Sequence, residues 1–165
     1  MTSETPKNPT PLSLLKNPVH GLAFGFGSGL VPKAPGTAGT VVAIPLYLLF
    51  AQLPLFEYVI LLVVTFLVGV YLCHKTAKDL EVHDHPGIVW DEFVGYWITM
   101  LAAPAGWYWV VAGFVLFRIF DVLKPWPISW LDKHVHGGFG IMIDDVLAGF
   151  MALAIMNVGY YFVLS

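Results

Sequence analysis

Residues 93–117, FVGYWITMLAAPAGWYWVVAGFVLF, decide the fold, because they can form either one long apolar helix or two short ones. The run Ala103-Pro104-Ala105-Gly106 lies in the middle of this stretch. Proline removes a backbone donor from a helix and glycine adapts to turns, so this run favours a break. We therefore predict two helices, over 93–103 and 106–120, joined by an outer turn at PAGW.

The composition around this stretch is that of a membrane protein. Of the 165 residues, 58% are hydrophobic and 12% are charged, with a mean hydropathy of +0.75, whereas soluble domains have about 25% charged residues. Three further apolar segments lie at 40–53, 55–73 and 146–164. A full span needs about 20 residues, so 55–73 and 146–164 are good candidates and the others are short. We expect a single domain, 1–165, with a polar N-terminal tail over 1–19.

The basic residues choose between four and five segments. With five segments and a cytosolic N-terminus, all eight lysines and arginines face the cytosol, as the positive-inside rule requires. With four, Arg118, Lys124 and Lys133 would lie outside. The sequence therefore predicts an all-α integral membrane protein, a compact bundle of about five transmembrane or re-entrant helices. Whether the hairpin over 88–120 spans fully or is re-entrant stays open. Because ten of the eleven acids lie at the cytosolic end, we expect the active site at that face.

Two acidic residues are each followed, four positions later, by a glycine: Asp91 by Gly95, and Asp145 by Gly149. Residues four apart share a helix face, and small residues let helices approach closely. We therefore expect the two glycines to mark a close helix contact, with Asp91 facing Asp145 and with Glu92 and Asp144 nearby. Two simpler readings stay open. Asp144 and Asp145 could cap the last helix, and Asp91 with Glu92 could be a solvated pair at the membrane interface.

Two further stretches carry chemistry that suits a phosphate. FRIFDVLKPWPI, 117–128, contains the chain's one arginine, Arg118, with Asp121 and Lys124. Arginine and lysine bind phosphate oxygens, and carboxylates bind hard divalent cations, although a local ion pair would also explain Arg118 and Asp121. GFGSGLVPKAPGTAGT, 25–40, precedes an apolar segment, and the exposed N–H groups at a helix start suit an anion. It could equally be a flexible entry to the first span.

Other metal and nucleophile chemistries have less support in the sequence. His83, His85, His134 and His136 form two loop pairs without an evident third ligand, so we expect solvated histidines. A cysteine phosphatase needs an arginine six residues after its thiolate, and Cys73 has Asp79 there.

Four motifs together resemble a known family. GSGLVPKAPGTAGT, WDEFVGYW, FRIFDVLKPWPI and MIDDVLAG occur in the order and approximate spacing of bacterial phosphatidylglycerophosphatase A, and the resemblance spans residues 21–150. It implies a Mg²⁺-dependent lipid phosphatase of the bacterial inner membrane, multi-pass, with its site facing the cytosol. Such an enzyme hydrolyses phosphatidylglycerophosphate to phosphatidylglycerol and phosphate.

The sequence and the resemblance together assign roles to the charged residues. We expect one or two Mg²⁺ ions on carboxylates, phosphate contacts from cations, and hydroxyl or backbone donors from threonines. The expected metal ligands are Asp91, Glu92, Asp121, Asp145 and Asp144; the expected phosphate contacts are Arg118, Lys124, Lys33, Thr37 and Thr40. Glu92 or Asp121 is expected to be the general base for water, and a carboxylate nucleophile stays open.

Two other function classes also stay open. The first is a phosphatase or phosphotransferase for another phospholipid or an isoprenoid phosphate. The second is a non-enzymatic small transporter, although its charges should then be spread along a span rather than gathered at one end. Oligomeric state and acyl-chain preference are not indicated.

Overall fold

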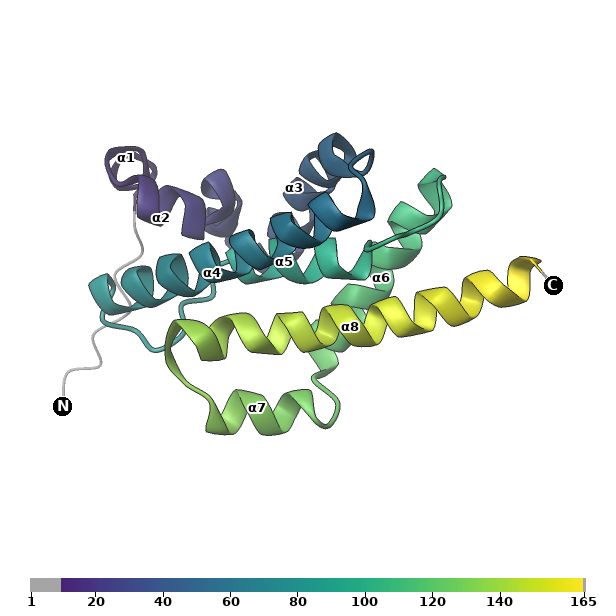
Figure 1. The fold of residues 1–165 in the computed structure, drawn as a ribbon. Helices are drawn as coiled ribbons and strands as arrows, with labels where there is room; N and C mark the ends of the chain where they lie inside the picture. The colour runs from purple at the N-terminus through teal and green to yellow at the C-terminus, as the bar shows by residue number, and fades with distance from the viewer. Residues whose placement is uncertain (1–9, 165) are drawn as a thin grey trace.

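The computed structural model describes residues 10–164, and this part of the chain is helical without a strand (Figure 1). The elements, in chain order, are α1 Pro11–Lys16, α2 Pro18–Ala23, the 3₁₀ segment η1 Gly25–Leu30, α3 Pro35–Phe50, α4 Leu55–Asp79, α5 Trp90–Thr99, α6 Trp107–Leu123, α7 Ile128–His134 and α8 Gly137–Leu164. Among the described residues, α4 and α8 are long and apolar enough to cross a membrane. The fold is therefore all-α, as predicted.

The stretch that decides the fold forms two helices. α5 ends at Thr99 and α6 begins at Trp107, which confirms the predicted break. Ala102 and Gly106 have φ angles of 55° and 130°, so the backbone between the helices leaves the helical region. α5 has only ten residues, a length of about 15 Å, which is half of a hydrocarbon layer of about 30 Å. It is shorter than the predicted segment and is not a full span by itself.

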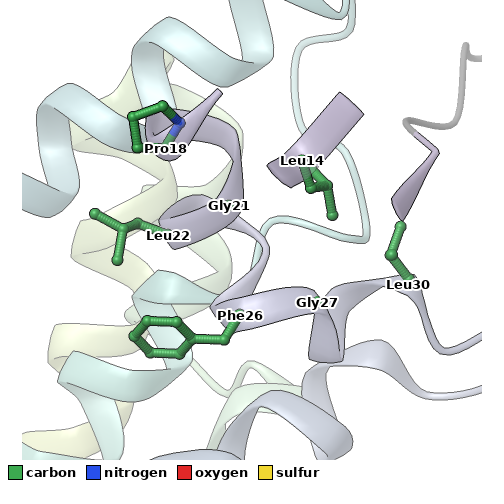
Figure 2. A pocket seen from close by; sticks show the side chains of 7 residues that line it. All are labelled: Leu14, Pro18, Gly21, Leu22, Phe26, Gly27 and Leu30. Carbon is green, nitrogen blue, oxygen red and sulfur yellow. The ribbon is translucent and has the colours of Figure 1, made fainter. Parts of the chain in front are cut away.

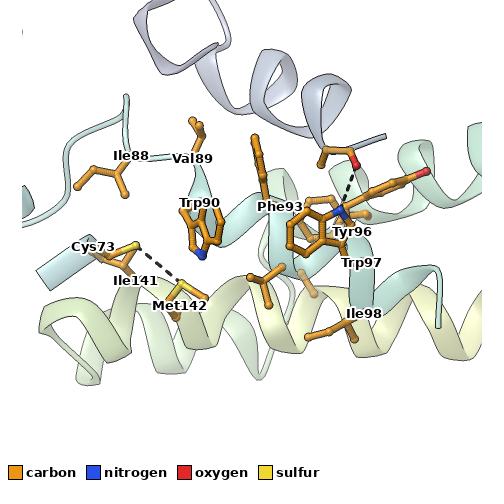
Figure 3. Close-up of a cluster of buried hydrophobic side chains, with 14 of the residues drawn as sticks. Cys73, Ile88, Val89, Trp90, Phe93, Tyr96, Trp97, Ile98, Ile141 and Met142 are labelled. Atoms are coloured by element: carbon orange, nitrogen blue, oxygen red, sulfur yellow. Dashed lines mark hydrogen bonds between the residues drawn. The ribbon is translucent and has the colours of Figure 1, made fainter. Parts of the chain in front are cut away.

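α5 is the centre of the bundle. Eight of its ten residues are buried, and it packs against α3, α4, α6 and α8. Figure 3 shows Trp90, Phe93 and Trp97 along this helix. The ring centroids of Trp90 and Phe93 are 5.6 Å apart, and those of Phe93 and Trp97 are 5.8 Å apart. The Trp97 indole N–H donates to the Ala43 carbonyl of α3 at 3.0 Å. A helix enclosed by protein on all sides does not need to match the thickness of a lipid layer.

α5 and α8 approach closely at two glycines. A Cβ added to Gly95 would lie 2.5 Å from the Phe117 ring and 2.8 Å from the Asp145 carbonyl oxygen, and one added to Gly149 would clash with the Gly95 carbonyl. Real Cβ atoms essentially never come this close to other atoms. The close helix contact predicted at these glycines is confirmed.

The N-terminal region differs from the prediction. Residues 1–9 of the predicted polar tail lie outside the described residues, but from Thr10 onward the chain forms α1 and α2. The Thr10 side chain caps the start of α1, and the Asn17 side chain caps the start of α2. In each helix a proline directly follows the capping residue. His20 Nε2 of α2 lies 3.0 Å from Asp79 Oδ2 of α4. This contact attaches the N-terminal helices to the bundle.

α8 begins earlier than the predicted segment. It starts at Gly137 rather than near residue 146, so Asp144 and Asp145 lie about two turns inside the helix. The alternative that these residues cap the helix is therefore wrong. The short helix α7 was also not predicted.

Candidate active site

A pocket of about 260 Å³ collects the charged residues of four separate stretches. Its lining includes six carboxylates and two cations, from the loop before α5 and from or next to α5, α6 and α8. They are Asp84, Asp91, Glu92, Asp121, Asp144, Asp145, Arg118 and Lys124. All five predicted metal ligands and two of the three predicted cations thus lie at one pocket.

Three of these carboxylates form the tightest group. Glu92, Asp121 and Asp145 each offer an oxygen, and the three atoms lie within 4.8 Å of one another. Like charges at this spacing disfavour ionisation unless a cation lies among them. Asp91 and Asp144 line the pocket outside this group. On α5, it is therefore Glu92 rather than Asp91 that completes the group with Asp145.

The two cations are held by the acids around them. Arg118 Nη1 forms an ion pair with Asp121 and lies 3.4 Å from Glu92 Oε1. Lys124 Nζ lies 3.3 Å from Asp144 Oδ2 and 2.6 Å from Asp132 Oδ1. Burial by itself lowers the pKa of Lys124, but the hydrogen bond to Asp132 and the charge of Asp144 raise that pKa above its usual value. Lys124 is thus a fixed positive charge at the edge of the pocket.

Several buried polar atoms of the pocket have no hydrogen-bond partner among the described residues. They are Asp91 Oδ1, Glu92 Oε2, Asp144 Oδ1, Asp145 Oδ2 and Arg118 Nε. Buried polar atoms are normally paired, and unpaired ones are costly. Two of these oxygens, Glu92 Oε2 and Asp145 Oδ2, belong to the group of three carboxylates, and unpaired carboxylate oxygens suit a hard divalent cation such as Mg²⁺. The residues present therefore fit the predicted metal.

The glycine-rich stretch brings backbone, rather than side chains, to the pocket. Ala34, Pro35 and Gly36 line it at the start of α3. A Cβ on Gly36 would clash with Glu92 Oε1 and come within 3.0 Å of Arg118 Nη1, so only glycine allows this approach. The first N–H groups of a helix lack intrahelical partners and, with the helix dipole, favour an anion.

The predicted side-chain donors of this stretch are placed elsewhere. Lys33 is exposed, and neither it nor Thr37 lines the pocket. Thr40 is fully buried, and its hydroxyl donates to the Gly36 carbonyl at 2.9 Å. The structure does not bring these three side chains to the wall of the acidic pocket.

Asp84 and His85 were missed as pocket residues. The expectation of a solvated histidine is wrong for His85, which is 4% exposed, lines the pocket and accepts the Gly87 N–H at Nδ1 at 2.9 Å. Burial lowers the pKa of His85, and Asp84 opposes that shift. Their position in the loop that leads into Asp91 and Glu92 was the available signal.

Comparison with known proteins decides the family. A family model described as phosphatidylglycerophosphatase A matches residues 21–160, which include every charged residue of the pocket. The chain belongs to the phosphatidylglycerophosphatase A family. This confirms the resemblance predicted from the four motifs.

Three relatives show how far the similarity extends. The phosphatidylglycerophosphatase A of Escherichia coli is 56% identical over 143 residues, covering 86% of this chain and 83% of that protein. The phosphatidylglycerophosphatase A of Haemophilus influenzae is 47% identical over 165 residues, covering 97% of this chain and 99% of that protein. A Bacteroides thetaiotaomicron protein, named provisionally as a phosphatidylinositol-3-phosphatase, is 41% identical over 145 residues, covering 83% of this chain and 90% of that protein. No solved structure matches the chain.

Proposed function

We propose that this chain is a Mg²⁺-dependent phosphatase that hydrolyses the terminal phosphate monoester of phosphatidylglycerophosphate to phosphatidylglycerol and inorganic phosphate. The observation that carries this proposal is the pocket, in which unpartnered carboxylate oxygens lie beside two cations and a helix N-terminus. The two relatives named phosphatidylglycerophosphatase A support the choice of substrate.

The metal would be held by the group of Glu92, Asp121 and Asp145. Mg²⁺ bound there supplies positive charge that polarises a phosphoryl oxygen and offsets the charge that develops during hydrolysis. Without such a cation, the six carboxylates of the pocket would repel an anionic substrate, since only two cations oppose them. The excess of acid is therefore itself an argument for a metal.

The phosphate would be bound by groups on the other sides of the pocket. Arg118 has an unpartnered Nε donor, and Lys124 contributes a fixed charge. The start of α3 adds main-chain N–H groups. Positioning of this kind is the larger part of catalysis in phosphoryl transfer.

Hydrolysis also requires a proton acceptor. Water attacks phosphorus, the bond from phosphorus to the glycerol oxygen breaks, water loses a proton to a carboxylate, and the departing oxygen gains one. Glu92 and Asp121, the bases predicted from the sequence, both belong to the proposed metal group. Asp91 lines the pocket outside that group and has an unpartnered Oδ1, so it is the carboxylate we favour as the base.

The placement in the membrane is part of the proposal. α4 and α8 are the candidate spans, and α3, α5 and α6 complete the five segments predicted from the sequence. In that arrangement one side of the membrane carries the starts of α3, α5 and α8 and the end of α6. The basic residues lie on the same side, and the positive-inside rule places that side in the cytosol. We propose a multi-pass protein of the inner membrane with the pocket at the cytosolic face.

The test is phosphate release by purified protein, with Mg²⁺ and with chelator. We expect chelator-sensitive release from phosphatidylglycerophosphate. Phosphatidylinositol-3-phosphate and an isoprenoid phosphate serve as competing substrates. Faster release from either would reassign the substrate, and no chelator-sensitive release from any of them would refute the enzyme proposal.

A further inference from the structure

A second pocket, of about 460 Å³, lies among the N-terminal helices (Figure 2). Its lining is apolar and comes from α1, α2 and η1: Leu14, Pro18, Gly21, Leu22, Phe26, Gly27 and Leu30. In the view of Figure 2, Pro18, Leu22 and Phe26 follow one side, and Leu14 and Leu30 the other. The volume lies in the range of about 300–1,000 Å³ that is typical of small-molecule sites.

The apolar pocket lies close to the acidic one. Leu30 lines the first and Ala34 the second, and four residues of extended chain span at most about 14 Å. The Phe26 ring centroid lies 6.3 Å from that of Phe93, which directly follows Glu92 in α5. The two pockets are thus lined by the two ends of one short segment, 30–36.

That segment carries an exposed positive charge between the residues that line the two pockets. Lys33 is exposed and lines neither of them. The side chain of Phe26, which is 62% exposed, lies near the same point of the chain. An apolar surface with a lysine beside it is what a protein presents at the boundary between lipid tails and headgroups.

We infer that the apolar pocket holds one acyl chain of the phospholipid substrate while its terminal phosphate occupies the acidic pocket. The bridging phosphodiester would then face Lys33. Along the chain, the apolar pocket is followed by the lysine and then by the acidic pocket. In the lipid, the acyl chain is followed by the diester and then by the terminal phosphate, so the two orders match. This inference rests on the proposed function and gives Lys33 a partner other than the scissile phosphate.

The pocket should act by positioning the lipid. Lipid tails in a bilayer are as apolar as the pocket, so transfer of a chain between them yields little free energy. A seated chain would instead fix the headgroup relative to the acidic pocket, and misplacement of a substrate lowers turnover. The expected signature is a loss that depends on the presence of an acyl chain.

The first experiment compares Leu30→Trp, which fills the pocket, with the matched control Val31→Trp, one residue outside its lining. Each is assayed on long-chain phosphatidylglycerophosphate in mixed micelles and on the same headgroup after deacylation. We expect Leu30→Trp to lower kcat/KM about tenfold on the long-chain lipid only, and Val31→Trp to leave both values within twofold of the unaltered protein. Equal losses on both substrates, or no loss, would overturn the inference.

The second experiment uses the unaltered protein. Phosphatidylglycerophosphate with a photoreactive group on one acyl chain should label peptides from residues 14–30, and unlabelled lipid should compete. Labelling confined to α4 and α8 would refute the acyl site. If the unaltered protein releases no phosphate from this lipid, the proposed function fails; if release is normal and labelling is confined to α4 and α8, only this inference fails.

Discussion

Gly36→Ala is the sharpest test of the pocket, because it should lower activity without weakening the fold. An added Cβ would lie 2.8 Å from the Glu92 carboxyl carbon and 3.0 Å from Arg118 Nη1, whereas ordinary contact begins at 3.4 Å. Glu92 must therefore move by more than half an ångström from its place in the carboxylate group that it shares with Asp121 and Asp145. A misplacement of about 1 Å costs on the order of a hundredfold, so we expect kcat/KM to fall about tenfold to a hundredfold.

The same substitution should not weaken the fold. Gly36 lies in the first turn of α3 without a positive φ. The atoms nearest to its added Cβ belong to the ends of the flexible side chains of Glu92 and Arg118, which can shift at little cost to the fold. Gly159→Ala is the matched control, since no atom lies within 4 Å of its added Cβ; it should leave activity unchanged. The assay is phosphate release together with the thermal unfolding midpoint. Full activity of Gly36→Ala would refute our placement of the helix start beside Glu92, and equal loss of activity in both variants would refute a local cause.

Three further predictions concern the carboxylates, the helix contact and pH. We expect a fall in kcat of at least about a hundredfold, with little change in unfolding midpoint, in each of the variants Asp91→Asn, Asp121→Asn and Asp145→Asn. Only the last two should raise the Mg²⁺ concentration needed for half-maximal activity. Full activity in any two of the three variants would contradict the shared site. Gly95→Ala should lower the free energy of unfolding by about 1–3 kcal/mol through overpacking, because its Cβ would lie 2.5 Å from the Phe117 ring; an unchanged denaturant midpoint would count against the close contact of α5 and α8. Burial lowers the pKa of His85 in the folded protein, whereas in the unfolded chain the imidazole has its ordinary pKa of about 6.5. The stability contributed by the buried neutral ring is therefore fully present above about pH 6.5, and it is lost as the pH falls toward the lower pKa of the folded state. His85→Gln should therefore lose less stability than the unaltered protein between about pH 7 and pH 5, and identical pH profiles of the unfolding midpoint would contradict this.

The sequence carried enough information for the hairpin and the helix contact. Pro104 and Gly106 restrict the backbone directly, so the break between α5 and α6 could be predicted without knowledge of neighbours. The spacing of Gly95 and Gly149 from their aspartates likewise belongs to the helix itself. Hydropathy, however, does not distinguish an apolar residue against lipid from one against protein. The enclosure of α5 could not be predicted for that reason.

The details of the site depended on contacts between distant segments. Successive residues of a helix point about 100° apart, so whether Asp91 or Glu92 joins Asp145 depends on how α5 is rotated within the bundle. At the start of α3, the predicted helix start does line the pocket at 34–36, whereas the predicted side chains of Lys33, Thr37 and Thr40 do not. Which side chains of this stretch reach the pocket depends on how α3 packs against α5 and α6.

The enclosure of α5 also bears on the order in which the chain can assemble. A helix of ten residues is too short to be recognised as a span, and its principal neighbour, α8, begins 38 positions after α5 ends and is the last helix to be synthesised. Until α8 is in place, one side of α5 lacks its protein cover, and the acids at its first turn lack Asp144 and Asp145. Completion of the core and completion of the acidic pocket are thus the same late event in biogenesis. A ribosome stalled before Gly137 would hold a chain that has neither.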